Sequence, residues 1–125
     1  KGLALRDRLR EEPLVSFTLA PHAPYTVSDA TFRQVATLAA ELDLAVHVHL
    51  HETAEELERS LAEHGVRPIE RLRRLGLIEP NLIAVHCGHL AKEEMQLLAH
   101  HGCSVVHCPS SNLKLASGFA PNNAV

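Results

Sequence analysis

The chain has no tryptophan, one tyrosine and three cysteines among its 125 residues. The cysteines, Cys87, Cys103 and Cys108, form no C-x-x-C pair, and their number is odd. This pattern argues against a secreted disulfide scaffold and against a zinc site built from thiolates. We therefore expect reduced thiols and a cytoplasmic protein.

Long hydrophobic runs and a strong charge of either sign are also missing. No apolar stretch approaches the roughly 20 residues that a membrane span needs, and the first twelve residues are too charged for a signal peptide. A formal net charge of −3 gives no electrostatic attraction to nucleic acid or to anionic membranes. We expect one domain over residues 1–125, with neither nucleic acid nor membrane as a partner.

Histidine, in contrast, is abundant, with ten residues. Four short apolar runs each end in a histidine, namely residues 17–22, 44–49, 82–86 and 103–107, which end in His22, His49, His86 and His107. Apolar runs without alternation, separated by helical segments, predict a parallel sheet covered by helices. Right-handed crossovers place the carboxyl ends of such strands at one edge, where β/α folds carry their chemistry. We expect the four histidines to share that edge.

The segments between the strands have helical periodicity and capping residues. Ser28 is expected to cap one helix, and Thr53 to begin another, with Glu56 completing a capping box and Leu57 and Leu61 facing inward. The predicted helices cover residues 1–10, 29–42, 53–64, 68–75 and 92–100, whereas residues 109–112 are predicted as a loop. The predicted order is α, β, α, β, α, α, β, α, β.

His49 and Glu52 form the most informative pair. A strand-end histidine followed three residues later by a carboxylate can place a metal ligand beside a group that moves protons. The alternative is that Glu52 is an ordinary acidic residue in the first turn of a helix.

The other strand-end histidines allow two interpretations each. His47 shares a face with His49 and could bind metal with it, but we favour a hydrogen-bonded core position. His51 is expected to be exposed or to contact substrate. His86 could contact a metal or its water, or be an interior hydrogen-bonded residue. His22, between two prolines, could contact substrate or belong to a tight turn.

The last histidine-ended run is less informative. His107 and the polar residues 110–114 that follow could contact substrate or only cap the edge of the sheet. We expect His89 to be structural or exposed.

Four ordered segments resemble the amidohydrolase superfamily. They are Pro-His-Ala-Pro-Tyr-Thr at 21–26, His-Leu-His-Glu-Thr at 49–53, Ala-Val-His-Cys at 84–87 and Pro-Ser-Ser-Asn-Leu-Lys-Leu-Ala-Ser-Gly at 109–118. They are most similar to the branch of the 5-methylthioadenosine/S-adenosylhomocysteine deaminases and related chlorohydrolases. The resemblance spans nearly the whole chain.

The resemblance implies a fold, a metal and a set of roles. The fold would be a partial α/β (β/α)₈ TIM barrel holding one divalent metal, Zn²⁺ ahead of Fe²⁺. His49 would be a metal ligand, Glu52 would move protons and contact the substrate ring, His86 would position the attacking hydroxide, and His22 would contact substrate. The implied reaction is hydrolytic deamination of a purine nucleoside with release of ammonia, with chlorohydrolase or guanine or cytosine deaminase chemistry as the alternative.

Parts of the family pattern are absent. The first-strand H-x-H and the eighth-strand Asp that supply the other metal ligands have no match, nor do two arginines that bind a substrate carboxylate. Such a barrel takes about 250 residues, so this chain resembles strands four to seven. Either it is the central part of a deaminase, or it is a half-barrel without a competent metal site. Its open sheet edges predict homo-oligomers.

Overall fold

A parallel sheet of four strands forms the centre of the computed structural model, which describes residues 1–118. The spatial order is β1-β2-β3-β4, and each neighbouring pair is parallel. The strands are β1 (Thr18–Leu19), β2 (Ala45–Leu50), β3 (Leu82–His86) and β4 (Ser104–Val106). The predicted parallel sheet is therefore confirmed, and its sequential order is that of one sector of a β/α barrel.

Helices connect the strands and begin at the expected caps. Ser28 Oγ accepts from Thr31 N at 3.2 Å, and Gly65 ends a helix in the left-handed conformation with φ 69°. The predicted loop at 109–112 is wrong, because Pro109 occupies the first turn of a short helix, where its fixed φ is favourable. The helices are α1 (Gly2–Leu9), α2 (Asp29–Leu42), α3 (Ala54–His64), α4 (Pro68–Arg74), α5 (Lys92–His100) and α6 (Pro109–Lys114).

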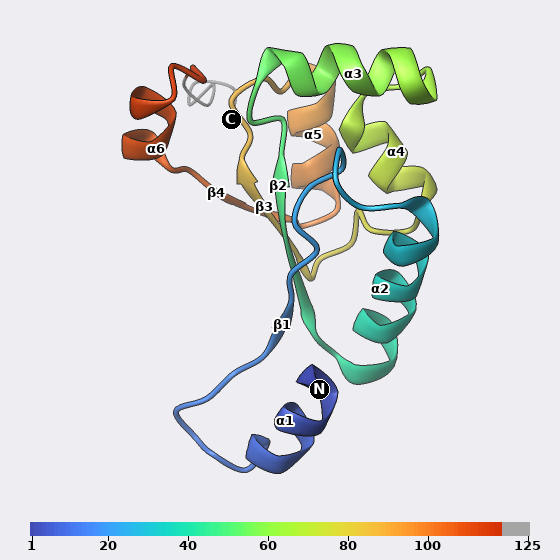
Figure 1. The fold of residues 1–125 in the computed structure, drawn as a ribbon, viewed down its shortest axis with the longest axis vertical. Coiled ribbons are helices and arrows are strands. Elements are labelled where there is room, and N and C mark those ends of the chain that lie inside the picture. Colours follow the sequence, from blue (N-terminus) through green and yellow to red (C-terminus); the bar gives the residue numbers. More distant parts are fainter. Residues whose placement is uncertain (119–125) are drawn as a thin grey trace.

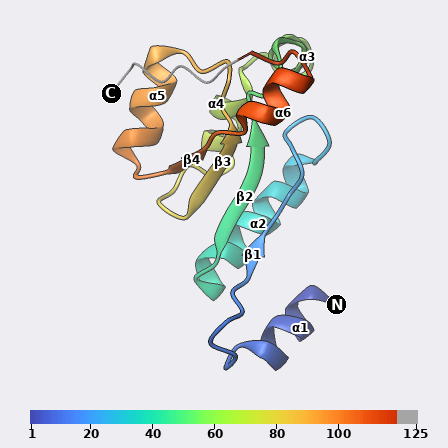
Figure 2. The same cartoon turned by 90° about the vertical axis from the view of Figure 1, so that its left-hand side faces the viewer.

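The two faces of the sheet differ in what covers them. Helices α2, α4 and α5 lie on one side, as Figure 1 shows, whereas the helix that residues 1–118 place on the face turned toward the viewer in Figure 2 is α6, near its upper end. Burial alternates accordingly along β2, where Val46, Val48 and Leu50 are buried and His47 and His49 are partly exposed. The apolar core lies between the sheet and the helices, with Phe32, Leu72 and Leu82 fully buried.

Helix α3 crosses above the carboxyl ends of the strands (Figure 1). Its inward face meets the backbone of polar loops, so its buried residues are Glu56 and Ser60. The Ser60 hydroxyl donates to Val66 O at 2.8 Å. The prediction that Leu61 faces inward is wrong, since it is 49% exposed, and Leu57 is only partly buried. Within residues 1–118, no helix is both long and apolar enough to span a bilayer.

Candidate active site

Three of the four strand-end histidines meet at one edge of the sheet. The ring centroids of His22 and His49 are 5.1 Å apart, and those of His49 and His86 are 5.3 Å apart. His22 lies in the loop after β1, His49 lies in β2 and His86 ends β3. His107 directly follows β4 and is partly buried. Residues separated by more than sixty positions in the sequence thus form one cluster.

Hydrogen bonds fix which ring nitrogens are free in this cluster. His49 Nδ1 donates to the carbonyl oxygen of His22 at 2.9 Å, so its Nε2 keeps a lone pair. Thr26 Oγ1 donates to Ala23 O at 3.2 Å. The hydroxyl has one proton, so the 2.8 Å contact between it and His22 Nδ1 has the imidazole as donor. Both His22 and His49 therefore present an unprotonated Nε2 when neutral.

Left-handed backbone at the strand ends redirects the side chains. His51 has φ 53°, and His86 and Cys87 have φ 75° and 52°, a conformation that is uncommon outside glycine. Alternation along β2 would place His51 beside His47 and His49, but the turn directs it away from that face. The prediction that His51 is exposed or contacts substrate is wrong, since it is 0% exposed.

The buried His51 holds the loop instead. Its Nε2 accepts from Ile69 N at 3.2 Å, at the start of α4. Burial lowers the pKa of His51 to about 4, so the ring is neutral and can act as this acceptor. His89 is structural, as expected, because its Nε2 donates to Ser117 O at 2.9 Å.

Glu52 is positioned by a second carboxylate. Glu56 accepts from His51 N at 3.2 Å and from Glu52 N at 2.9 Å. Only half of the predicted capping box is formed, because Thr53 Oγ1 accepts from Glu56 N while the Glu56 carboxylate reaches past Thr53 to these two amides. Glu52 Oε1 lies 3.4 Å from His86 Nε2. The strand-end carboxylate and the third histidine are thus neighbours.

His86 is both an interior residue and part of the cluster. It is 5% exposed, and its Nδ1 lies 2.8 Å from Asn112 Oδ1 in α6. Asn112 is 1% exposed. The sequence placed Asn112 only in a polar segment after the last strand, and no local pattern reveals that it reaches His86.

An open hollow of about 490 Å³ lies over the uncovered face of the sheet beside this cluster. Its volume is in the range of small-molecule sites. His47 lines it and makes no hydrogen bond through its ring within residues 1–118, so the prediction of a hydrogen-bonded core position is wrong. The hollow is lined by Ala20, Pro21, His22, His47, Val48, His49, Val85, Val106 and Cys108.

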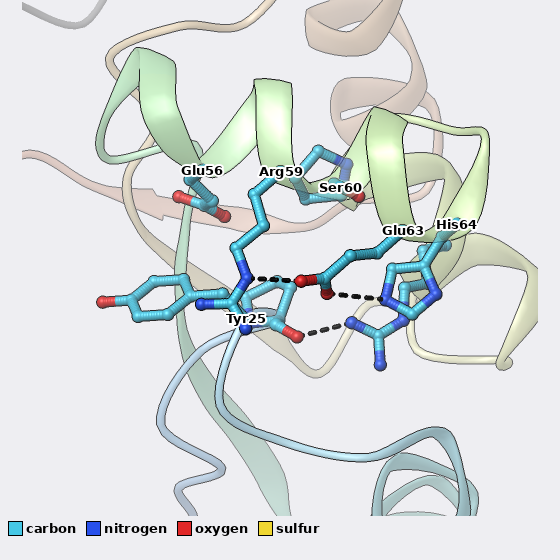
Figure 3. Close-up of a pocket in the computed structure, with 9 residues that line it drawn as sticks. Tyr25, Glu56, Arg59, Ser60, Glu63 and His64 are labelled. Carbon is cyan, nitrogen blue, oxygen red and sulfur yellow. Dashed lines mark hydrogen bonds and ion pairs between the residues drawn. The ribbon is translucent and has the colours of Figure 1, made fainter.

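A second pocket, between α3 and the loop that carries His22, is too small for a substrate (Figure 3). Its volume of about 10 Å³ is close to that of one water molecule. Arg71 from α4 lies beside it and donates to Pro24 O and to Val27 O, the latter at 3.0 Å. Arg71 also donates to Asp29 Oδ1 at 2.8 Å and lowers the pKa of that carboxyl. These bonds hold the loop of His22 in place.

The arrangement defines a class of protein. Parallel strands that bring two histidines and a glutamate together at their carboxyl ends are typical of one sector of a (β/α)₈ barrel, which carries its site at that end. The amidohydrolase family model matches residues 2–124. The chain belongs to the amidohydrolase family.

Individual relatives agree with this family. A 5-methylthioadenosine/S-adenosylhomocysteine deaminase of Teredinibacter turnerae is 50% identical over 125 residues, and one of Saccharophagus degradans is 47% identical over 121. The chain covers 100% and 97% of its own length in these alignments, but only 28% and 27% of the relatives. It therefore spans little more than a quarter of their length.

Solved structures show the same partial coverage. A zinc-bound adenosine deaminase from Xanthomonas campestris is 55% identical with a TM-score of 0.96, over 98% of this chain and 28% of that one. A zinc complex of atrazine chlorohydrolase from Arthrobacter aurescens is 24% identical with a TM-score of 0.89, over 96% and 27%. The second likeness concerns the fold alone.

Proposed function

We propose that this chain is a segment of a metal-dependent hydrolytic deaminase that acts on purine nucleosides of the 5-methylthioadenosine/S-adenosylhomocysteine type. The observation that carries the proposal is the cluster of His49, Glu52 and His86 at the strand ends, with Glu52 Oε1 3.4 Å from His86 Nε2. Relatives with this deaminase name, at 50% and 47% identity, support the substrate class. Free Cys87, Cys103 and Cys108 suit the cytoplasm that we propose.

His49 is suited to act as a metal ligand. Its Nδ1 donates to a carbonyl oxygen at 2.9 Å, which is the usual way of orienting a ligating imidazole and leaves Nε2 free. A catalytic zinc takes three protein ligands, and residues 1–118 hold no group of three histidine, cysteine or acidic side chains placed for a metal. We propose that other segments of the intact protein complete a Zn²⁺ site, with Fe²⁺ as the alternative metal. When bound, such a metal would lower the pKa of a water molecule to about 7.

Glu52 would move the protons of the reaction. A carboxylate beside the attacking water can accept its proton and return it to a ring nitrogen or to the departing amine, so that ammonia leaves. The two amides held by Glu56 fix the backbone from which Glu52 extends, at 3.2 and 2.9 Å. Positioning of this kind lowers the entropic cost of proton transfer.

His86 and His22 would orient the reactants. His86 faces Glu52 and would hold the attacking oxygen by a hydrogen bond, while its position 5.3 Å from the His49 ring keeps it beside the metal ligand. His22 borders the hollow and would contact the substrate. Its loop is held rigid by Arg71.

Ammonia release tests the proposal. The intact protein, loaded with zinc, should release ammonia from 5-methylthioadenosine, S-adenosylhomocysteine or adenosine, and not from guanine or cytosine. Chlorinated triazines serve as the comparison, with chloride release as the readout. Turnover of a chlorinated substrate, or of guanine or cytosine, without turnover of any purine nucleoside would overturn the proposal.

A further inference from the structure

Asn112 is a buried polar residue for which the proposed reaction gives no role. It lies in α6 and is 1% exposed, and its Oδ1 is 2.8 Å from His86 Nδ1. An amide oxygen can only accept, so His86 Nδ1 must carry the proton of this bond. The other nitrogen, Nε2, faces the carboxylate oxygen Glu52 Oε1, 3.4 Å away.

We propose that Asn112 is a positioning residue that fixes both the orientation and the Nδ1–H tautomer of the His86 ring. The consequence for catalysis rests on the deaminase function proposed above, whereas the tautomer itself does not. With Nδ1 bonded to Asn112, His86 directs Nε2 toward Glu52 and the substrate side of the site.

Among the described residues, Asn112 is the one placed to fix the orientation of the His86 ring. The ring extends from a residue with φ 75°, so the regular alternation of β3 does not fix its direction. Within residues 1–118, the Asn112 amide makes the one hydrogen bond to the ring. Without that acceptor, the Glu52 carboxylate beside Nε2 favours a proton on Nε2 instead of Nδ1.

Asn112 also carries a cost that an apolar residue would avoid. Its Nδ2 is buried and has no hydrogen-bond partner within residues 1–118. An unpaired buried donor destabilises a protein, so a residue that only filled space here would be better replaced by leucine. We therefore attribute the presence of an amide here to the hydrogen bond that its Oδ1 accepts from His86 Nδ1.

Nitrogen NMR of the intact, zinc-loaded protein labelled with ¹⁵N-histidine tests the assignment. The His86 signals are identified by their loss in His86→Gln. We expect a protonated Nδ1 in the wild type and in Asn112→Asp, which keeps the shape and the acceptor. Asn112→Leu should shift the proton from Nδ1 toward Nε2 and lower kcat about 10- to 100-fold with KM little changed. Leu113→Ala, at a 63% exposed neighbouring position, is the control and should change neither.

A wild-type His86 with a protonated Nε2 and an unprotonated Nδ1 would overturn the proposal, because Asn112 would then donate through Nδ2. A folded Asn112→Leu with unchanged tautomer and unchanged kcat would also overturn it. If Asn112→Leu does not fold, the wild type and Asn112→Asp still decide the tautomer. Should the intact protein release no ammonia, the proposed function fails while the tautomer result stands.

Discussion

His49 donates two hydrogen bonds to one atom, the carbonyl oxygen of His22. The ring Nδ1 is 2.9 Å from it and the backbone nitrogen 3.1 Å. The loop after β1 therefore sets both the register of β2 and the direction of the His49 ring. A ring held in this way presents Nε2 at the edge of the sheet without further loss of rotamer freedom.

The 125-residue chain alone should bind Zn²⁺ weakly. His49 supplies one oriented nitrogen, and even with His86 the site has fewer than the three protein ligands of a catalytic zinc. Titration calorimetry followed by dialysis should show that zinc is lost, with weaker binding still in His49→Gln. Stoichiometric zinc that survives dialysis would contradict this account of the ligand set.

Replacing Glu56 by glutamine should destabilise the fold. The amide has one acceptor atom in place of the two that hold His51 N and Glu52 N, and its NH₂ group would face a backbone donor. We expect a loss of about 1–3 kcal/mol in the free energy of unfolding. Urea denaturation measures it, with Glu58→Gln on the exposed face of α3 as the matched control. Equal stability of the two variants would show that the bonds from His51 N and Glu52 N to the Glu56 carboxylate do not stabilise the fold.

Glu70 should contribute stability that acid removes. Hydrogen bonds from Arg73 and then Arg74 lower the pKa of Glu70 from 4.5 to about 2. A lowered pKa in the folded state means that the contribution is present above 4.5 and is lost as the pH falls toward 2. Because the three side chains are partly exposed, the contribution is below about 1 kcal/mol.

The difference in unfolding free energy between the wild type and Glu70→Gln measures this contribution. It should shrink to zero between about pH 6 and about pH 2, and should also shrink in high salt. A difference that stays constant over this pH range would show that the ion pairs do not cause it.

The isolated 125-residue chain should self-associate. Strand β4 pairs only with β3 within residues 1–118, and its Val105 and Val106 are 48% and 39% exposed. An unpaired strand edge with apolar side chains is a template for further pairing. Light scattering should show mass rising with concentration, and less so in Val105→Lys. A strictly monomeric chain at high concentration would count against this prediction.

The sequence predicts the strands and their parallel order because each strand is a short apolar run that a helical segment separates from the next. It also predicts that His22, His49 and His86 lie at one edge of the sheet, since each ends a predicted strand, and the structure places their rings side by side. It misplaces His51, because a residue just after a strand is expected at the surface, whereas a positive φ of 53° turns this side chain into the interior. The contact of Asn112 with His86 joins residues 26 positions apart and depends on a helix that the sequence does not predict.

The sequence also does not predict that Glu56 is buried and binds two loop amides, or that Leu61 is exposed, and the reason is related. Helix α3 packs across strand ends, as Figure 1 shows, and so buries polar residues that hold loop amides. A prediction from hydrophobic periodicity assumes that a helix packs against an apolar surface. For α3 it therefore selects the wrong face as the buried one.

The most direct test of the account is Glu52→Gln in the intact protein, with bound metal and ammonia release measured on the same sample. Glutamine keeps the size of the side chain but cannot accept and return a proton. We predict full metal content, because His49 remains held by His22 at 2.9 Å, and no detectable ammonia from a purine nucleoside that the wild type deaminates. Ammonia release at the wild-type rate with metal bound would contradict the central role of Glu52.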